Sequence, residues 1–195
     1  MTESTVNSPE AVEMFQFLHD LIYEYGVAPD PKVTGAEFIT DQVGMQWGGR
    51  WLLGDYYGND FYDVDIVYVP TKATNQVISG VGIFPISAAS EKKDEAYKLA
   101  TWLSSADSQS RILATSHIPS SKTCLETVRE SDFPANSYIY ADSADIARSV
   151  ECPKEYADLQ EIFDRYVGLI YADEMEVQAA LDACKEEMDL VLMGF

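Results

Sequence analysis

Basic residues are scarce in this 195-residue chain: 13 Lys and Arg stand against 33 Asp and Glu, which gives a formal net charge of −20. A surface of this sign repels phosphate backbones and anionic lipid headgroups. The acidic residues are spread along the chain without long runs, which is typical of a solvated acidic surface. We therefore expect neither nucleic acid nor a membrane surface as a partner.

Cysteine is also scarce, and the three residues present, Cys124, Cys152 and Cys184, are too far apart for a zinc ribbon or a disulfide scaffold. Two of them could form a disulfide in an oxidising compartment, but burial as small apolar residues is the more common role. No run is long and apolar enough to span a membrane, and the first residues lack the basic start and apolar core of a signal peptide.

Sequence motifs of common catalytic sites are missing. There is no Walker loop, nucleophile elbow, His-Glu-x-x-His or strand-to-helix Gly-x-Gly-x-x-Gly. The two histidines, His19 and His117, are isolated, and acidic residues are too abundant for a glycosidase pair to be recognised. Missing motifs do not exclude an enzyme, but nothing in the sequence argues for one, and we expect no metal site and no cofactor.

One informative stretch runs from Val77 to Leu103. It begins as an apolar run with two glycines, Gly80 and Gly82, continues as a strand-like segment at 83–86 and reaches a polar turn at 87–90. A glycine before a strand indicates a bend or a close approach to the backbone. The helix expected next has apolar residues at the spacing of one buried face: Ala96, Leu99, Ala100 and Leu103.

The rest of the chain alternates predicted helices and strands. A helix is expected after Asn7, the predicted cap, and two long helices are expected after Pro153 and over 174–192. Strand-like segments occur at 43–47 and 63–70. This order predicts an α/β protein.

Several of these segments together resemble a known family. Gly80-Val81-Gly82, Ile86-Ser87-Ala88-Ala89-Ser90, Lys92-Lys93 and the helix from Ala96 to Leu103 follow one another in the order found in extracellular solute-binding proteins of bacterial ABC importers. The resemblance is to the carbohydrate-binding class, which is maltose-binding-protein-like. Gly44, Met45, Gly49 and Trp51 also fall on a Met-x-x-x-Gly-x-Trp pattern of that family.

The resemblance assigns a sugar-stacking role to Trp51, which Trp47 could share, because the C–H faces of pyranose rings pack well on a rigid aromatic plane. The alternative is that both tryptophans are core residues. Arg50 could donate to sugar hydroxyls, although pairing with a carboxylate is its default role. The predicted ligand-binding residues are Trp47, Gly49, Arg50, Trp51, Gly80, Val81, Gly82 and Tyr156.

The fold that the resemblance implies is α/β, periplasmic-binding-protein-like of type II and partial, with helices packed on short mixed sheets. Relatives are about twice as long, and the likeness is to their C-terminal half. Residues 7–68 and 137–192 would be parts of one lobe and 77–122 a segment of the other, with the family's N-terminal half absent.

The function that the resemblance implies is the substrate-binding component of an ABC sugar importer, which closes over a carbohydrate and delivers it to the permease. In full-length form it would be extracellular or periplasmic, either secreted or lipid-anchored. Edges left open by the missing half could cause self-association. The alternative is a soluble carbohydrate-active enzyme or a structural domain that shares only the packing pattern. A binding cleft would expose Trp51, whereas a packed core would bury it.

Overall fold

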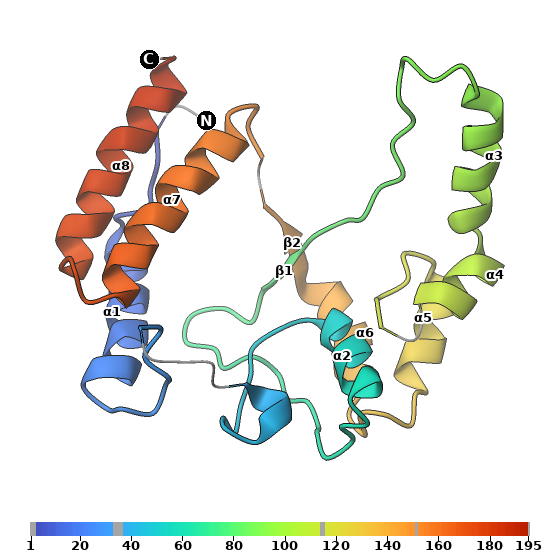
Figure 1. The fold of residues 1–195 in the computed structure, drawn as a ribbon, viewed down its shortest axis with the longest axis horizontal. Helices are drawn as coiled ribbons and strands as arrows, with labels where there is room; N and C mark the ends of the chain where they lie inside the picture. Colours follow the sequence, from blue (N-terminus) through green and yellow to red (C-terminus); the bar gives the residue numbers. More distant parts are fainter. Residues whose placement is uncertain (1–2, 33–36, 114–115, 151, 195) are drawn as a thin grey trace. The chain divides into compact units, whose positions relative to one another are not determined.

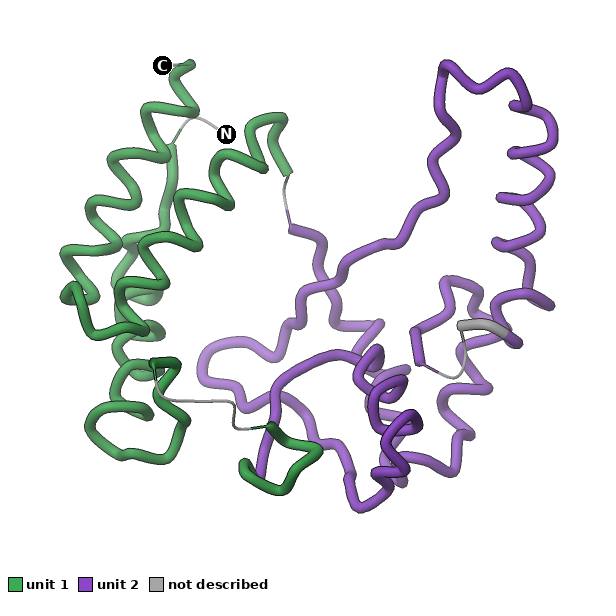
Figure 2. Tube along the Cα trace, in the orientation of Figure 1, with its two compact units in different colours: residues 1–43, 151–195 green, residues 44–150 purple. Residues whose placement is uncertain are grey.

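The computed structural model describes residues 3–32, 37–113, 116–150 and 152–194. The chain divides into two compact units, residues 1–43 with 151–195 (unit 1) and residues 44–150 (unit 2) (Figure 2). The bounds of these units differ from those of the predicted lobes. Residues 44–68 and 137–150 were predicted to share a lobe with the chain ends, but here they belong to the same unit as 77–122. The lobe assignment concerns the complete fold of the family and stays a prediction.

Unit 1 is built on three helices, α1 (Pro9–Tyr23), α7 (Tyr156–Tyr171) and α8 (Val177–Met193), with a short turn η1 (Phe38–Thr40) (Figure 1). The three helices share an apolar core, in which the rings of Phe15 and Phe163 meet edge to face at 5.9 Å. Its buried members recur at helical spacing: Phe15, Leu159, Ile162, Ile170, Val177, Ala180, Leu181, Cys184 and Met188.

The ends of these helices follow from local signals. Ser8 caps α1 by accepting a hydrogen bond from the amide of Ala11, and Pro9 occupies the first turn. Asn7, the predicted cap, instead donates to Asp182 of α8 at 2.7 Å. Gly194, in the left-handed conformation, ends α8. The three predicted helices are confirmed with small shifts of their bounds.

Unit 2 contains the shorter elements. In chain order these are η2 (Arg50–Leu52), α2 (Leu53–Gly58), β1 (Val77–Ser79), α3 (Lys93–Leu103), α4 (Ala106–Ser108), the π-helical turn η3 (Gln109–Leu113), α5 (Lys122–Arg129), α6 (Tyr138–Ser143), η4 (Ala144–Ile146) and β2 (Ala147–Ser149). Its buried residues come mainly from α2, α5 and α6: Leu53, Tyr56, Cys124, Val128, Ile139 and Ala141.

The sheet of unit 2 is small. β1 and β2 pair in parallel, with Val77 opposite Ala147 and Ser79 opposite Ser149, and among the described residues no further strand joins them. The α/β class is confirmed, but the expected mixed sheets are replaced by this one parallel pair. The strands predicted at 43–47, 63–70 and 83–86 are irregular here. A strand needs a neighbouring strand to satisfy its backbone, and no strand among the described residues pairs with these segments.

The helix α3 also differs from its prediction. It begins at Lys93 rather than beside Ser90, and the hydroxyl of Ser90 accepts from the amide of Lys92. None of its residues is buried, and Leu99, which lies on the predicted buried face, is exposed. Among the helices in the described residues, none combines the length and the apolar character needed to cross a bilayer.

Candidate functional site

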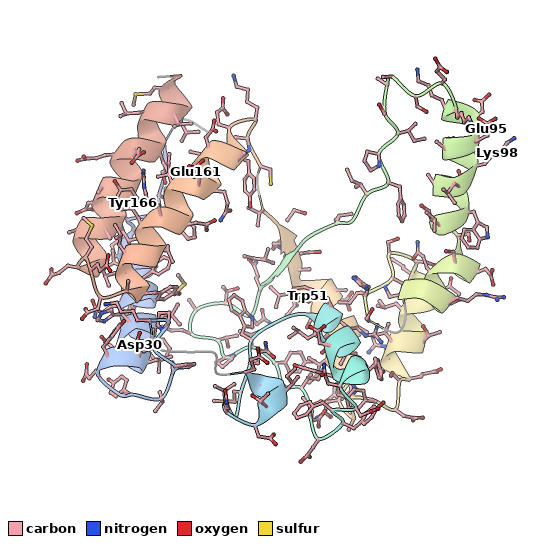
Figure 3. The ribbon with its side chains drawn as sticks, in the orientation of Figure 1. Asp30, Trp51, Glu95, Lys98, Glu161 and Tyr166 are labelled. Atoms are coloured by element: carbon pink, nitrogen blue, oxygen red, sulfur yellow. The ribbon has the colours of Figure 1, made fainter. Side chains whose placement is uncertain are left out.

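The centre of the candidate site is Trp51, which lies in η2 just before α2 (Figure 3). Its indole rests on the backbone of Gly49: a methyl group at that glycine would lie 2.0 Å from a ring carbon. Only a residue without a side chain permits this approach. The ring nevertheless keeps 63% of its surface exposed. Trp51 is therefore a supported and accessible aromatic plane, not a core residue.

The next turn fixes this arrangement. Leu53, fully buried at the start of α2, anchors the chain two residues after the indole. A methyl group at Gly48 would likewise lie 2.3 Å from the side chain of Leu52. The Gly48-Gly49 pair, which the sequence marks as a strand breaker, thus lets two large side chains fold back over the backbone.

Arg50 lies between these groups and is buried, with 2% of its surface exposed. Its Nη1 donates to the backbone carbonyl of His117 at 2.6 Å, and its guanidinium lies 5.9 Å from the ring centre of Tyr140. Burial lowers the pKa of Arg50 and raises the pKa of Tyr140 to about 12. In this structure Arg50 ties η2 to the segment before α5, and its role as a ligand contact stays a prediction.

Trp47 lies in the irregular segment before η2 and has 84% of its surface exposed. The segment is held to α2 by the hydroxyl of Tyr56, which donates to Oε1 of Gln46 at 3.2 Å. Exposure of Trp47 and Trp51 together contradicts the alternative that both are core residues. Unit 2 therefore offers two exposed indoles four residues apart.

The predicted Gly80-Val81-Gly82 segment directly follows β1. A methyl group at either glycine would meet no atom within 4 Å, and Val81 is exposed. The space beside both glycines is therefore open. Structure alone gives no local reason for the two glycines, so the backbone approach inferred from the sequence stays a prediction.

Tyr156 is the one predicted site residue outside unit 2. It begins α7 in unit 1, is exposed, and its hydroxyl donates to Oε1 of Gln160 at 3.0 Å. The other seven predicted residues lie in unit 2, and Gly49, Arg50 and Trp51 share one turn of chain. The role of Tyr156 stays a prediction.

An aromatic cluster in unit 2 was not predicted. The rings of Tyr57, Tyr62 and Phe133 contact one another, with centroids 5.4–6.2 Å apart. Residues 56–62 are rich in aromatics, which signals the local part of the cluster, but no pattern in the sequence points to Phe133, 71 positions after Tyr62. These packed rings stabilise the chain that follows α2.

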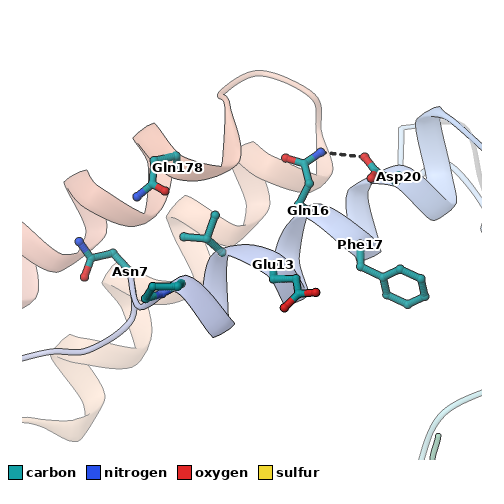
Figure 4. A pocket seen from close by; sticks show the side chains of 8 residues that line it. Asn7, Glu13, Gln16, Phe17, Asp20 and Gln178 are labelled. Atoms are coloured by element: carbon teal, nitrogen blue, oxygen red, sulfur yellow. Dashed lines mark hydrogen bonds between the residues drawn. The ribbon is translucent and has the colours of Figure 1, made fainter. Parts of the chain in front are cut away.

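Unit 1 has an open hollow beside α1, far along the chain from most predicted site residues (Figure 4). It is lined by Asn7, Pro9, Val12, Glu13, Gln16, Phe17, Asp20 and Gln178. The amide of Gln16 donates to Asp20 at 2.7 Å across this surface. No predicted site residue lines it. Among the described residues, no three His, Cys, Asp or Glu side chains gather as a metal site would require.

Comparison with known proteins places the fold. The family model described as bacterial extracellular solute-binding protein matches residues 1–137. The structure resembles the ABC substrate-binding protein Lmo0181 from Listeria monocytogenes, solved in complex with cycloalternan, with a TM-score of 0.82 and 20% identity. It also resembles the cyclic alpha-maltosyl-1,6-maltose binding protein from Arthrobacter globiformis, with a TM-score of 0.70 and 22% identity.

Both likenesses cover this whole chain but only 52% and 51% of the other two chains. The chain thus spans about half the length of these solved structures, as predicted for the C-terminal half of such a protein. Identities this low show the common fold alone. A search of curated proteins finds no significant match.

Proposed function

Because the chain belongs to the bacterial extracellular solute-binding protein family, we propose that it forms the C-terminal part of the substrate-binding component of an ABC sugar importer. The observation that carries this proposal is the exposed indole of Trp51 seated on Gly49. A ring held in this way presents a flat apolar surface at little entropic cost, which suits the C–H face of a pyranose.

We assign the stacking contact to Trp51, with Trp47 beside it in sequence as a second platform. We assign hydrogen bonds to sugar hydroxyls to the backbone groups of Gly80, Val81 and Gly82, and Tyr156 is a further proposed ligand contact. The names of both similar solved proteins refer to bound saccharides, which supports a carbohydrate ligand. The family consists of binding proteins, so the role proposed is binding and not catalysis.

The proposed partners follow from the same role. The ligand-bound form of the full-length protein delivers the saccharide to the transmembrane subunits of the importer, outside the cell or in the periplasm, as a secreted or lipid-anchored protein. Self-association through open strand edges is a separate proposal for the chain on its own, and light scattering of the purified chain tests it.

The test is calorimetric titration of oligosaccharides into this chain and into a version restored to full length, with Trp51→Ala in both. We expect a saccharide that binds the restored wild type and loses about tenfold or more in affinity with Trp51→Ala, which corresponds to roughly 1.4 kcal/mol.

Tyr25→Ala is the matched control, because Tyr25 is also an exposed aromatic residue but lies in unit 1, outside the site. Equal losses for both variants would remove Trp51 from the site. No binding of any oligosaccharide to the restored protein would overturn the carbohydrate assignment.

A further inference from the structure

The proposed saccharide site has few polar side chains. Arg50 is the only charged residue among the predicted contacts, and it is buried with its Nη1 on the carbonyl of His117. The hydroxyl of Tyr156 already donates to Gln160. Binding sites for small molecules combine apolar surface with a few well-placed polar groups. An exposed polar side chain beside Trp51 would complete such a site.

The segment that contains His117 lies against the turn that carries Trp51. Just before the indole in sequence, Nη1 of Arg50 donates to the carbonyl of His117 at 2.6 Å. Just after it, a methyl group at Gly54 would lie 3.9 Å from Cβ of Ser116. Two contacts that flank Trp51 in sequence therefore place the backbone of His117 beside this turn.

The chain that follows His117 is held by η3. The buried side chain of Gln109 donates from Nε2 to Oγ of Ser120 at 3.0 Å, and its Oε1 accepts from the amide of Ser121 at 3.0 Å. Pro119 is buried and restricts the backbone between these contacts. The side chain of His117 is nevertheless exposed. The structure thus fixes the backbone of this residue and leaves its imidazole accessible.

The two ring nitrogens of His117 differ in their surroundings. Nδ1 lies 3.0 Å from Oγ of Ser116, whereas Nε2 has no hydrogen-bond partner among the residues that the structure describes. A neutral imidazole has one donor and one acceptor nitrogen, and a bond at one nitrogen sets the role of the other. A sugar hydroxyl both donates and accepts, so it can pair with Nε2 in either role.

We propose that His117 is a further ligand-contact residue, whose Nε2 hydrogen-bonds a hydroxyl of the saccharide that stacks on Trp51. This inference rests on the proposed function and adds a polar side chain to the predicted contacts. The indole supplies an apolar face, and the imidazole supplies a directed bond. The carbonyl of His117, not its side chain, accepts from Arg50. Replacement of the imidazole therefore leaves that hydrogen bond in place.

The test follows the imidazole Cε1–Hε1 signals of the two histidines of this sequence by NMR spectroscopy. Short neutral oligosaccharides of glucose, galactose and mannose are titrated into the protein restored to full length. We expect the His117 signal to move as the site saturates and the His19 signal to stay. His19 is the internal reference, because its side chain is only 18% exposed and its Nε2 lies 3.0 Å from Asp173 in unit 1.

Replacing the histidines separates a ligand contact from a structural role. His117→Phe keeps an aromatic ring but removes both nitrogens, so we expect about a fivefold to tenfold loss of saccharide affinity with an unchanged melting temperature. His117→Gln keeps a polar amide near the place of Nε2 and should retain most of the affinity. His19→Phe is the matched control and should bind like wild type. The loss of one signal in each variant also assigns the spectrum.

The outcomes distinguish this inference from the proposed function. Wild-type affinity for His117→Phe, or a His117 signal that does not move when saccharide binds, would overturn the inference and leave the proposed function standing. A loss of affinity that His19→Phe shares equally would also overturn it. If none of these oligosaccharides binds the restored wild type, the proposed function itself fails, and the role of His117 fails with it.

Discussion

Unit 1 and unit 2 differ in how much of their stability each can supply by itself. In unit 1 three helices meet around one core, and each helix satisfies its backbone within its own segment. Unit 2 has short helices, one pair of three-residue strands and, after β1, apolar side chains that are largely exposed. The candidate site lies in unit 2.

The comparison teaches that helices form from local contacts, whereas sheets depend on contacts between distant parts of a chain. Helices need only neighbours three and four residues away, whereas a sheet needs strands that can be distant in the chain. Unit 2 therefore contains most of the residues of the proposed sugar site but, among the described residues, only one pair of strands.

The largest effect is expected from a cavity in unit 1. Leu181 is fully buried between the helices, so Leu181→Ala should lower the free energy of unfolding by about 2–5 kcal/mol. Leu190→Ala in the same helix and Ile78→Ala in unit 2 remove similar groups from exposed positions and should change it by less than about 0.5 kcal/mol. Urea unfolding followed by circular dichroism measures all three. Equal losses at Leu181 and Ile78 would break the comparison.

A smaller loss of stability is expected when the hydrogen bond from Arg50 to the carbonyl of His117 is removed in unit 2. Arg50→Met removes the charged donor to the carbonyl of His117 and should cost about 1–3 kcal/mol. Arg111→Met removes an exposed ion pair with Asp107 and should cost roughly 0.3–0.5 kcal/mol. Thermal unfolding and saccharide titration should be run together. Lost binding with unchanged stability would show that Arg50 contacts the ligand directly.

The contact between Gly49 and the indole of Trp51 can be tested by itself. Gly49→Ala places a methyl group where the ring of Trp51 lies, so the indole must move. We expect saccharide affinity of the restored full-length protein to fall about tenfold, or roughly 1.4 kcal/mol. Gly58→Ala, at a position where a methyl group meets nothing within 4 Å, is the control for glycine replacement. Unchanged affinity for Gly49→Ala would mean that the seat does not position the ring.

The smallest expected effect on the free energy of unfolding comes from one carboxyl group in each unit, and it has the same direction in both. Arg129 hydrogen-bonds Asp142 in unit 2 and lowers the pKa of that carboxyl, and Arg165 does the same for Glu187 in unit 1. A lowered carboxyl pKa stabilises the fold above the ordinary values of 3.8 and 4.5. The contribution is lost as the pH falls through the lowered pKa of the folded state.

Asp142→Asn and Glu187→Gln should therefore be slightly less stable than wild type at pH 7 and equal to it at strongly acidic pH. Carboxyl titration by NMR spectroscopy checks the direction of each shift. A pKa of Asp142 at or above 3.8 would contradict the prediction for unit 2 while leaving unit 1 unaffected.

The sequence was most informative where the determining contacts are local. The helices that became α1, α7 and α8 follow from periodic apolar residues, with Phe15, Ile162 and Leu181 on the buried faces. The strands expected at 43–47 and 83–86 have suitable residues, but no described segment pairs with them. The periodicity of apolar residues identifies those that favour burial, but it does not show whether another segment packs against them.

The candidate site divides in the same way. Trp51 and Gly49 follow from the family pattern, and the structure adds the contact between them. Burial of Arg50 could not be predicted, because its acceptor, His117, is 67 residues away. Nor could the packing of Phe133 on Tyr57 and Tyr62, since an isolated Phe has no pattern that identifies its neighbours.

The distribution of tryptophan has a spectroscopic consequence. Trp47, Trp51 and Trp102, the three in the sequence, all lie in unit 2 and are all more than half exposed. Their fluorescence should already resemble that of indole in water, so unfolding of unit 1 would pass almost unseen in the emission spectrum. Binding of a sugar on Trp51 would instead shift the emission to the blue. Intrinsic fluorescence should therefore report the unfolding of unit 1 poorly and the binding of a ligand at Trp51 well.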